Sequence, residues 1–139
     1  MTELSDDQKR LVQSSFHALS ANVDTTARVF YGHLFAQDPA LRGLFKTDLE
    51  SQGRRLMDML GVLVVGLDNV SALSGAITLL GRQHLRYGVQ RAHFRLFENA
   101  LLYTVEQVLG EEYTAEVGTA WRAAYRAIEA IIIENAYSD

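Results

Sequence analysis

The sequence predicts a single domain built entirely from α-helices. Apolar residues recur at steps of three and four along most of the 139 residues, which is the period of an amphipathic helix. The alternation typical of β-strands is almost absent, and the chain contains one proline. We therefore expect residues 1–139 to form one all-α domain with about seven helices.

The composition excludes several classes of function. The chain has no cysteine, which rules out disulfides, thiolate nucleophiles, zinc–cysteine sites and iron–sulfur clusters. A formal net charge of −4 without runs of Lys or Arg gives no sign of a nucleic-acid partner or a polybasic membrane anchor. No signal peptide is evident, and no apolar stretch reaches the roughly 18 residues of a membrane span. We expect a soluble, cytoplasmic protein.

Start and stop signals divide the chain into helices. Ser5 and Gln8 have the spacing of a capping box, and Asp38 with Pro39 has the form of a cap followed by a first-turn residue. Gly88 suits the left-handed conformation that ends many helices. We predict helices over about 5–20, 22–37, 38–46, 48–67, 73–87, 91–109 and 114–136, and a loop over 67–71.

One predicted helix, Leu73–Tyr87, carries a histidine in its apolar stripe. His84 shares a face with Leu73, Ile77 and Leu80, so it should point inward. A neutral imidazole on such a face needs a partner, and the candidates are a backbone carbonyl, a water or a metal. For a lone inward histidine the carbonyl is the commoner partner.

Two further polar residues, Tyr31 and Gln52, lie on the inward stripes of other helices. Alone, Tyr31 suits a core aromatic whose hydroxyl meets a carbonyl, and Gln52 suits a helix-edge amide. Together with His84 they suggest one imidazole opposite two hydrogen-bond donors, an arrangement that binds a diatomic ligand on a metal. No inward His, Asp or Glu cluster completes a metal shell, so the other ligands must come from a cofactor, and haem fits. His33 should face solvent, and His17 should be structural.

Several motifs together resemble the bacterial single-domain globins. This family is closely related to the Vitreoscilla-type haemoglobin and to the globin module of flavohaemoglobins. The resemblance implies a globin fold, which is a three-over-three helical sandwich with a short or absent D helix, and a haem b cofactor. The motifs that carry it are residues 30–35, 38–45, Gln52 with Leu56, His84 with 87–89, 92–94, and the 120–125 pattern.

The resemblance also implies roles for individual residues. His84 would be the proximal iron ligand, Tyr31 and Gln52 the distal donors, and Phe45 the aromatic that packs on the porphyrin. Leu56 would wall the distal pocket. The wider cofactor pocket would include Leu80, Val89 and Phe94. Arg86 and His93, with Arg82 as a further candidate, would face the haem carboxylates, although an ordinary solvated arginine is equally consistent with those two arginine positions.

The chain departs from the flavohaemoglobin pattern on the proximal side. That pattern places a tyrosine and a glutamate against the proximal histidine, where this chain has Phe94 and Ala136. Glu134 is two residues from the second position and should face another way. His84 should therefore be a plainer neutral ligand, which favours dioxygen binding over peroxide-type cleavage.

The resemblance leads to a functional hypothesis with alternatives. We expect a haem globin that reversibly binds dioxygen, and also NO and CO, for storage, delivery or buffering. The alternatives are a nitric oxide dioxygenase or weak peroxidase served by an external reductase, a gas sensor acting through a partner, and a helical scaffold without cofactor.

Overall fold

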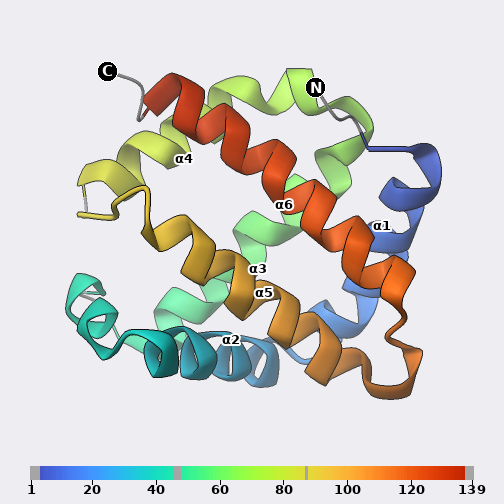
Figure 1. Ribbon diagram of the computed structural model, residues 1–139, viewed down its shortest axis with the longest axis horizontal. Helices are drawn as coiled ribbons and strands as arrows, with labels where there is room; N and C mark the ends of the chain where they lie inside the picture. The colour runs from blue at the N-terminus through green and yellow to red at the C-terminus, as the bar shows by residue number, and fades with distance from the viewer. Residues whose placement is uncertain (1–3, 46–47, 87, 137–139) are drawn as a thin grey trace.

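The computed structural model describes residues 4–45, 48–86 and 88–136, without the side chains of Ser71, Arg86 and Ala136. These residues form helices throughout (Figure 1). The α-helices are α1 (Asp6–Ala21), α2 (Val23–Gln37), α3 (Leu49–Val65), α4 (Ser74–Arg86), α5 (His93–Leu109) and α6 (Ala115–Ala136). The 3₁₀ segments are η1 (Pro39–Leu44), η2 (Gly66–Leu73) and η3 (Gly110–Glu112). The prediction of an all-α fold is confirmed.

The helix boundaries follow from local hydrogen bonds. The predicted capping box is present, since Gln8 N donates to Ser5 Oγ at 3.1 Å and Ser5 N donates to Gln8 Oε1 at 3.0 Å. The Asp48 carboxylate caps α3 by accepting from Ser51 N at 2.9 Å. Gly88 has φ of +92° after α4, as expected of a residue that stops a helix in the left-handed region.

The short helix expected over 38–46 is present as the 3₁₀ helix η1, with Asp38 as its cap and Pro39 in its first turn, and its predicted end at residues 46–47 lies outside the described residues. One segment differs from the prediction. The loop predicted over 67–71 is wrong, because these residues belong to the helical turns of η2, with a kink at Asn69. Asp68 and Asn69 resemble a loop in composition, but η2 follows α3 directly and its Leu67 side chain is buried in the core. Tyr87, the predicted end of the fourth long helix, also lies outside the described residues.

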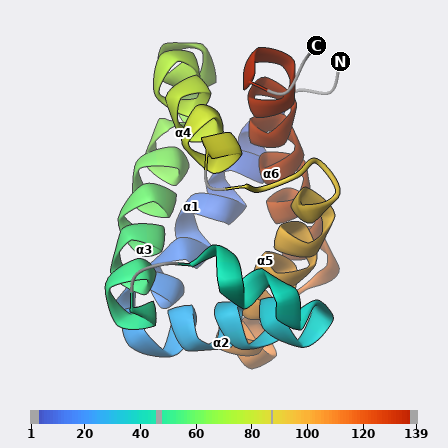
Figure 2. The same ribbon diagram turned by 90° about the vertical axis from the view of Figure 1, so that its left-hand side faces the viewer.

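The long helices lie on two sides of the molecule. Figure 2 shows α3 and α4 on the left and α5 and α6 on the right, with α1 between them and α2 crossing the bottom. Helix α6 packs on both α1 and α4, and α2 packs on both α3 and α5. Helix α3 packs on α1 and α2 but makes few direct contacts with α4 among the described residues. The two helices that carry Gln52 and His84 are thus held by different neighbours.

The buried apolar residues form two clusters. The larger cluster joins α1, α2, α3, α5 and α6 and includes Tyr31. The smaller one contains Leu63, Ile77, Val89, Phe94 and Ile132, which come from around α4. At the crossing of α2 and α3, a Cβ added to Gly53 would lie only 2.7 Å from the Cβ of Ala27, so this crossing requires glycine.

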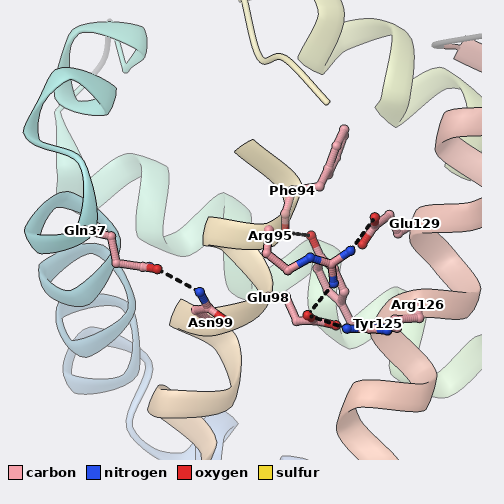
Figure 3. Close-up of polar contacts among 8 residues, drawn as sticks. All are labelled: Gln37, Phe94, Arg95, Glu98, Asn99, Tyr125, Arg126 and Glu129. Atoms are coloured by element: carbon pink, nitrogen blue, oxygen red, sulfur yellow. Dashed lines mark hydrogen bonds and ion pairs between the residues drawn. The ribbon is translucent and has the colours of Figure 1, made fainter. Parts of the chain in front are cut away.

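Helices α5 and α6 are also joined by ion pairs between the buried Glu98 and two half-exposed arginines (Figure 3). The Glu98 side chain is 2% exposed and accepts hydrogen bonds from Arg95 and, at 2.7 Å, from Arg126 Nε. These arginines hold the pKa of Glu98 below its usual range despite the opposing effect of burial. No described helix is both long enough and apolar enough to cross a bilayer.

Candidate functional site

His84 sits in the last turns of α4 with its two ring nitrogens in different surroundings. Its Nδ1 lies 2.7 Å from the backbone carbonyl oxygen of Leu80, one helical turn earlier. A carbonyl can only accept, so Nδ1 carries the proton and donates it. The neutral ring then has its lone pair on Nε2, which has no hydrogen bond within the part of the chain that the structure describes. His84 can therefore donate to the Leu80 carbonyl through Nδ1 and still bind a metal through Nε2.

The surroundings of His84 keep it neutral. The ring lies beside Phe94 and Phe97, with centroid distances of 6.4 Å and 6.3 Å. Burial lowers the pKa of His84, and the hydrogen bond to Leu80 opposes this only in part. A neutral imidazole with a free Nε2 is the form that binds a metal.

Tyr31 and Gln52 are brought together, as the sequence suggested. The Tyr31 side chain is 5% exposed, and its hydroxyl donates to the backbone carbonyl of Gln52 at 3.4 Å. Burial raises the pKa of Tyr31, while a hydrogen bond with the Gln52 side chain lowers it to a smaller extent. Tyr31 therefore keeps its proton and is a hydrogen-bond donor at neutral pH. A bond from the hydroxyl to a carbonyl is what the sequence suggested for Tyr31 as an ordinary core aromatic. That the carbonyl belongs to Gln52 was not predicted, because hydrophobic periodicity places side chains and gives no information on carbonyl partners.

An aromatic group surrounds the Tyr31 ring. Phe45 meets it edge-on with the centroids 5.4 Å apart, and Phe35 stacks on it at 5.8 Å. Phe45 and Leu56 are both half-buried, so part of each apolar side chain remains accessible. This face therefore offers a hydroxyl in an otherwise apolar wall.

The other predicted cofactor residues lie in or beside the smaller cluster. Val89 and Phe94 are buried, and Leu80 is half-buried against them. His93 is half-buried at the start of α5, where its Nδ1 accepts from Gln90 N at 3.0 Å. The side chain of Arg86 lies outside the described residues, and that of Arg82 is exposed.

Two histidines differ from expectation. His33 was expected to face solvent, but it is half-buried and stacks on Tyr103 with centroids 4.2 Å apart. The neighbouring helix α5 supplies this ring, which a single-helix projection does not include. His17 was expected to be structural, yet its side chain is exposed on α1. Neither residue belongs to the candidate site.

Polar side chains of α5 and α6 lie behind Phe94. The Tyr125 hydroxyl donates to the Phe94 backbone carbonyl at 2.6 Å (Figure 3). Behind it, Glu129 has one buried carboxylate oxygen, Oε2, without a hydrogen-bond partner among the described residues. Burial, with a contribution from the charge of Glu98, raises the pKa of Glu129. Glu134 is exposed, and the side chain of Ala136 lies outside the described residues.

Sequence reasoning missed this network. A usable sign was present, because Glu98 follows Phe94 by four residues and so lies on the buried stripe of α5. A buried glutamate needs positively charged partners, and Arg95 on α5 and Arg126 on α6 could have been assigned to Glu98.

The residues present suit a planar, mostly apolar cofactor that brings its own metal ligands. His84 supplies one unprotonated nitrogen, and Tyr31 supplies one donor in an aromatic wall. Among the described residues, no three His, Asp or Glu side chains converge as a metal site made of protein ligands would require. The donor set therefore fits haem, whose porphyrin provides four nitrogens.

Comparison with known proteins also points to a haem protein. The globin family model matches residues 28–132. Leghemoglobin-1 of Lupinus luteus is 29% identical, over 100% of this chain and 99% of that protein. The flavohemoprotein of Vibrio cholerae is 23% identical over 95% of this chain, which spans only 34% of that protein.

Solved structures match over nearly the whole chain. One is described as an engineered carbene transferase and putative nitric oxide dioxygenase from Rhodothermus marinus. It has a TM-score of 0.86 and 30% identity, and the match covers 96% of this chain and 94% of that one. A bacterial globin from Campylobacter jejuni has a TM-score of 0.82 and 17% identity, with 96% of each chain covered, and supports the fold alone.

Proposed function

The chain belongs to the globin family, and we propose that it holds haem b through Nε2 of His84 and binds dioxygen reversibly. The observation that carries this proposal is the hydrogen bond from His84 Nδ1 to the Leu80 carbonyl. It fixes the tautomer and directs the ring, so that Nε2 is presented as an unprotonated ligand. Burial supports the assignment, because a histidine that stays neutral does not have to lose a proton in order to bind the iron.

Haem supplies a ferrous iron that can bind a diatomic gas, and the protein sets how long the gas remains. Leu80, Val89 and Phe94 on the His84 side, with Phe45 and Leu56 on the other, would enclose the porphyrin and exclude water. Exclusion of water strengthens the electrostatic interactions made inside the pocket. His93 and Arg86 would pair with the haem carboxylates.

Tyr31 and Gln52 would donate hydrogen bonds to the bound gas. Tyr31 keeps its proton because burial raises its pKa, so it can donate at any physiological pH. To reach the gas, its hydroxyl exchanges the Gln52 carbonyl, which it meets at a long 3.4 Å, for a more negatively charged acceptor. A long neutral bond is exchanged for a charge-assisted one, so little stability is lost.

An absorbance spectrum tests this function directly. The purified protein is measured in the ferric state, after reduction with dithionite, and after exposure of the reduced sample to air. We expect a strong Soret band and a stable dioxygen complex. If added hemin produced no Soret band, the assignment of His84 and the function would both fail.

A second candidate is nitric oxide dioxygenation with electrons from a separate reductase. It is supported by the 30% identity to the structure described as a putative nitric oxide dioxygenase. Phe94 weighs against it, since its ring offers His84 no hydrogen bond. Repeated additions of nitric oxide to the dioxygen-saturated protein with a reductase distinguish the two. Turnover beyond one equivalent would support the enzyme, and a halt after one equivalent would support simple dioxygen binding.

A further inference from the structure

Helix α5 begins without a side-chain cap. Its first residue, His93, follows Ala92, whose backbone is already helical, and no described side chain caps the free amides of the first turn. Helices α1 and α3, in contrast, begin after Ser5 and Asp48, whose side chains accept hydrogen bonds from first-turn amides. The first turns of α5 therefore depend on contacts with neighbouring helices for their position.

Tyr125 of α6 holds the first turn of α5 from one side (Figure 3). Its hydroxyl donates to the backbone carbonyl of Phe94 at 2.6 Å. A carbonyl inside a helix also accepts from the amide four residues later, so the tyrosine uses its second lone pair. Burial raises the pKa of Tyr125, and the hydroxyl therefore stays protonated and remains a donor. This bond ties the backbone at Phe94 directly to α6.

Gln37, the last residue of α2, holds α5 from the opposite side. Its Nε2 donates to the Leu96 carbonyl at 2.9 Å, and its Oε1 accepts from Asn99 Nδ2 at 3.0 Å. Figure 3 shows Gln37 and Tyr125 on opposite sides of α5. Side chains from two different helices thus donate to α5 carbonyls that lie two residues apart, and together they fix the rotation of this turn as well as its position.

The same turns of α5 present the rings of Phe94 and Phe97 to His84. Their centroids lie 6.4 Å and 6.3 Å from that of the imidazole, with the ring planes inclined to it by 34° and 66°. The two phenylalanine rings meet edge-on with centroids 5.9 Å apart. Helix α4, which carries His84, packs mainly on α6 and has few direct contacts with α5 among the described residues. Helix α5 therefore reaches the imidazole through these two side chains.

The hydrogen bond to Leu80 does not by itself fix the plane of the His84 ring. It restrains one atom, Nδ1, and hydrogen bonds to a carbonyl oxygen tolerate a broad range of directions. The freedom that remains is limited by the groups packed against the imidazole, which include the rings of Phe94 and Phe97. The direction in which Nε2 points therefore depends on where α5 places these rings.

We propose that Tyr125 and Gln37 are positioning residues for the His84 imidazole. By holding the carbonyls of Phe94 and Leu96, they place the two phenylalanine rings that orient Nε2. The consequence for iron rests on the proposed function, since a ligand already held in the binding direction binds more tightly than one that must first be ordered. Neither Tyr125 nor Gln37 has a hydrogen bond or ring contact with His84 among the described residues, so each acts through the position of α5.

Matched single substitutions separate positioning from stability. Tyr125→Phe deletes only the hydroxyl, and Gln37→Leu replaces the amide with apolar atoms of similar size. Thr26→Val and Gln13→Leu are the controls, because each loses the same kind of bond elsewhere. Thr26 donates to a backbone carbonyl of α1 at 2.8 Å, and Gln13 donates to one of α3 at 3.2 Å. Urea unfolding measures the stability that each variant loses, and we expect similar losses within each pair.

In the haem-loaded protein, the iron–histidine stretching band reports how the imidazole is held. We expect this band, in the reduced protein without bound gas, to shift and broaden in Tyr125→Phe and in Gln37→Leu and to stay unchanged in both controls. Haem should also pass about 10-fold faster to an excess of a competing haem-free globin, the lower end of what loss of a residue supporting a metal ligand costs. An unchanged band in the two site variants would overturn the proposal. Equal shifts in the controls would overturn it as well, since the band would then follow stability alone.

A second measurement does not depend on iron. In NMR spectra of the full chain without haem, the ring currents of Phe94 and Phe97 shift the ring protons of His84 by an amount that depends on the distance and angle of the rings. These chemical shifts should change in Tyr125→Phe and Gln37→Leu and stay the same in the controls. Chemical shifts that stay the same in all variants would overturn the proposal. If the protein bound no haem yet these chemical shifts changed as expected, the proposed function would fail while the positioning of His84 stood.

Discussion

The candidate site has a Tyr31 side and a His84 side, and these two groups of residues are built differently. On the Tyr31 side, a buried hydroxyl lies against Gln52 within an aromatic wall. On the His84 side, the only hydrogen bond of the imidazole among the described residues goes to a carbonyl of its own helix, and phenylalanine rings surround it. Polar groups such as Tyr125 and Glu129 stand behind Phe94. Under the proposed function, this difference would put control of a bound gas on the Tyr31 side and leave the His84 ligand without a hydrogen bond from another residue.

Removal of the histidine is the most severe test of this comparison. We expect His84→Ala to weaken haem binding by more than the roughly 10- to 100-fold that loss of a residue supporting a ligand costs. Hemin titration followed at the Soret band measures the effect, and free imidazole should restore part of it. The control is His33→Ala, which removes an imidazole that stacks on Tyr103 outside the site. Equal haem affinity in both variants would contradict the assignment.

The donor side is tested by Tyr31→Phe, which deletes a single hydroxyl. A charge-assisted hydrogen bond is worth about 1.5–3 kcal/mol, so dioxygen should dissociate roughly 10- to 100-fold faster. Carbon monoxide carries less charge on its outer atom and should dissociate at nearly the same rate as before. Stopped-flow displacement measures both rates. An unchanged dioxygen off-rate would show that the Tyr31 hydroxyl does not slow the release of dioxygen.

Phe94→Tyr adds a hydroxyl on the His84 side and tests whether a polar group placed there can reach the imidazole. Phe94 is 3% exposed in the smaller cluster, where a hydroxyl without a partner costs about 1–3 kcal/mol. We expect that loss in urea unfolding, with the iron–histidine stretching frequency unchanged. A stable variant with a shifted frequency would mean that the new hydroxyl reaches His84, and that the side is less isolated from polar groups than we infer.

The smallest effect is expected from Glu129→Gln, in the layer behind Phe94. Burial and the charge of Glu98 raise the pKa of Glu129, so its ionised form destabilises the fold at neutral pH. The variant should be more stable at pH 7 by about 0.5–1 kcal/mol, since its ion pair with the half-exposed Arg95 contributes little.

The stability gained by Glu129→Gln should depend on pH in a definite direction. Because the folded pKa lies above the unfolded one, the folded protein takes up this proton first as the pH falls. The advantage of Glu129→Gln should therefore shrink as the pH falls through the raised pKa, and vanish below the unfolded value. Urea unfolding between pH 4 and 8 measures it. Dioxygen off-rates should not change, and a change would place Glu129 in contact with the iron site.

Much of this arrangement could be predicted from the sequence, for identifiable reasons. Periodicity and caps gave the α-helices, and the inward stripes pointed Tyr31 into the core, while its contact with Gln52 comes from the packing of α2 on α3. The cap and the proline correctly predicted the short helix η1, but periodicity over six residues does not show that it is a 3₁₀ helix. The segment 67–71 was misassigned as a loop because Asp68 and Asn69 are typical of loops. Periodicity also treats each helix alone, so the stacking of His33 on Tyr103 and the pairing of Glu98 with Arg126 were missed. The assignment of iron to His84 remains a prediction.

The division of the core into two clusters has a consequence for opening motions. The larger cluster draws on α1, α2, α3, α5 and α6, while α4 is held mainly by α6 and by η2. An element with fewer packed neighbours opens at a lower free energy than the whole fold. Amide protons of α4 should therefore exchange with solvent before those of α5. The same local opening gives a bulky cofactor a way in without unfolding the rest of the chain.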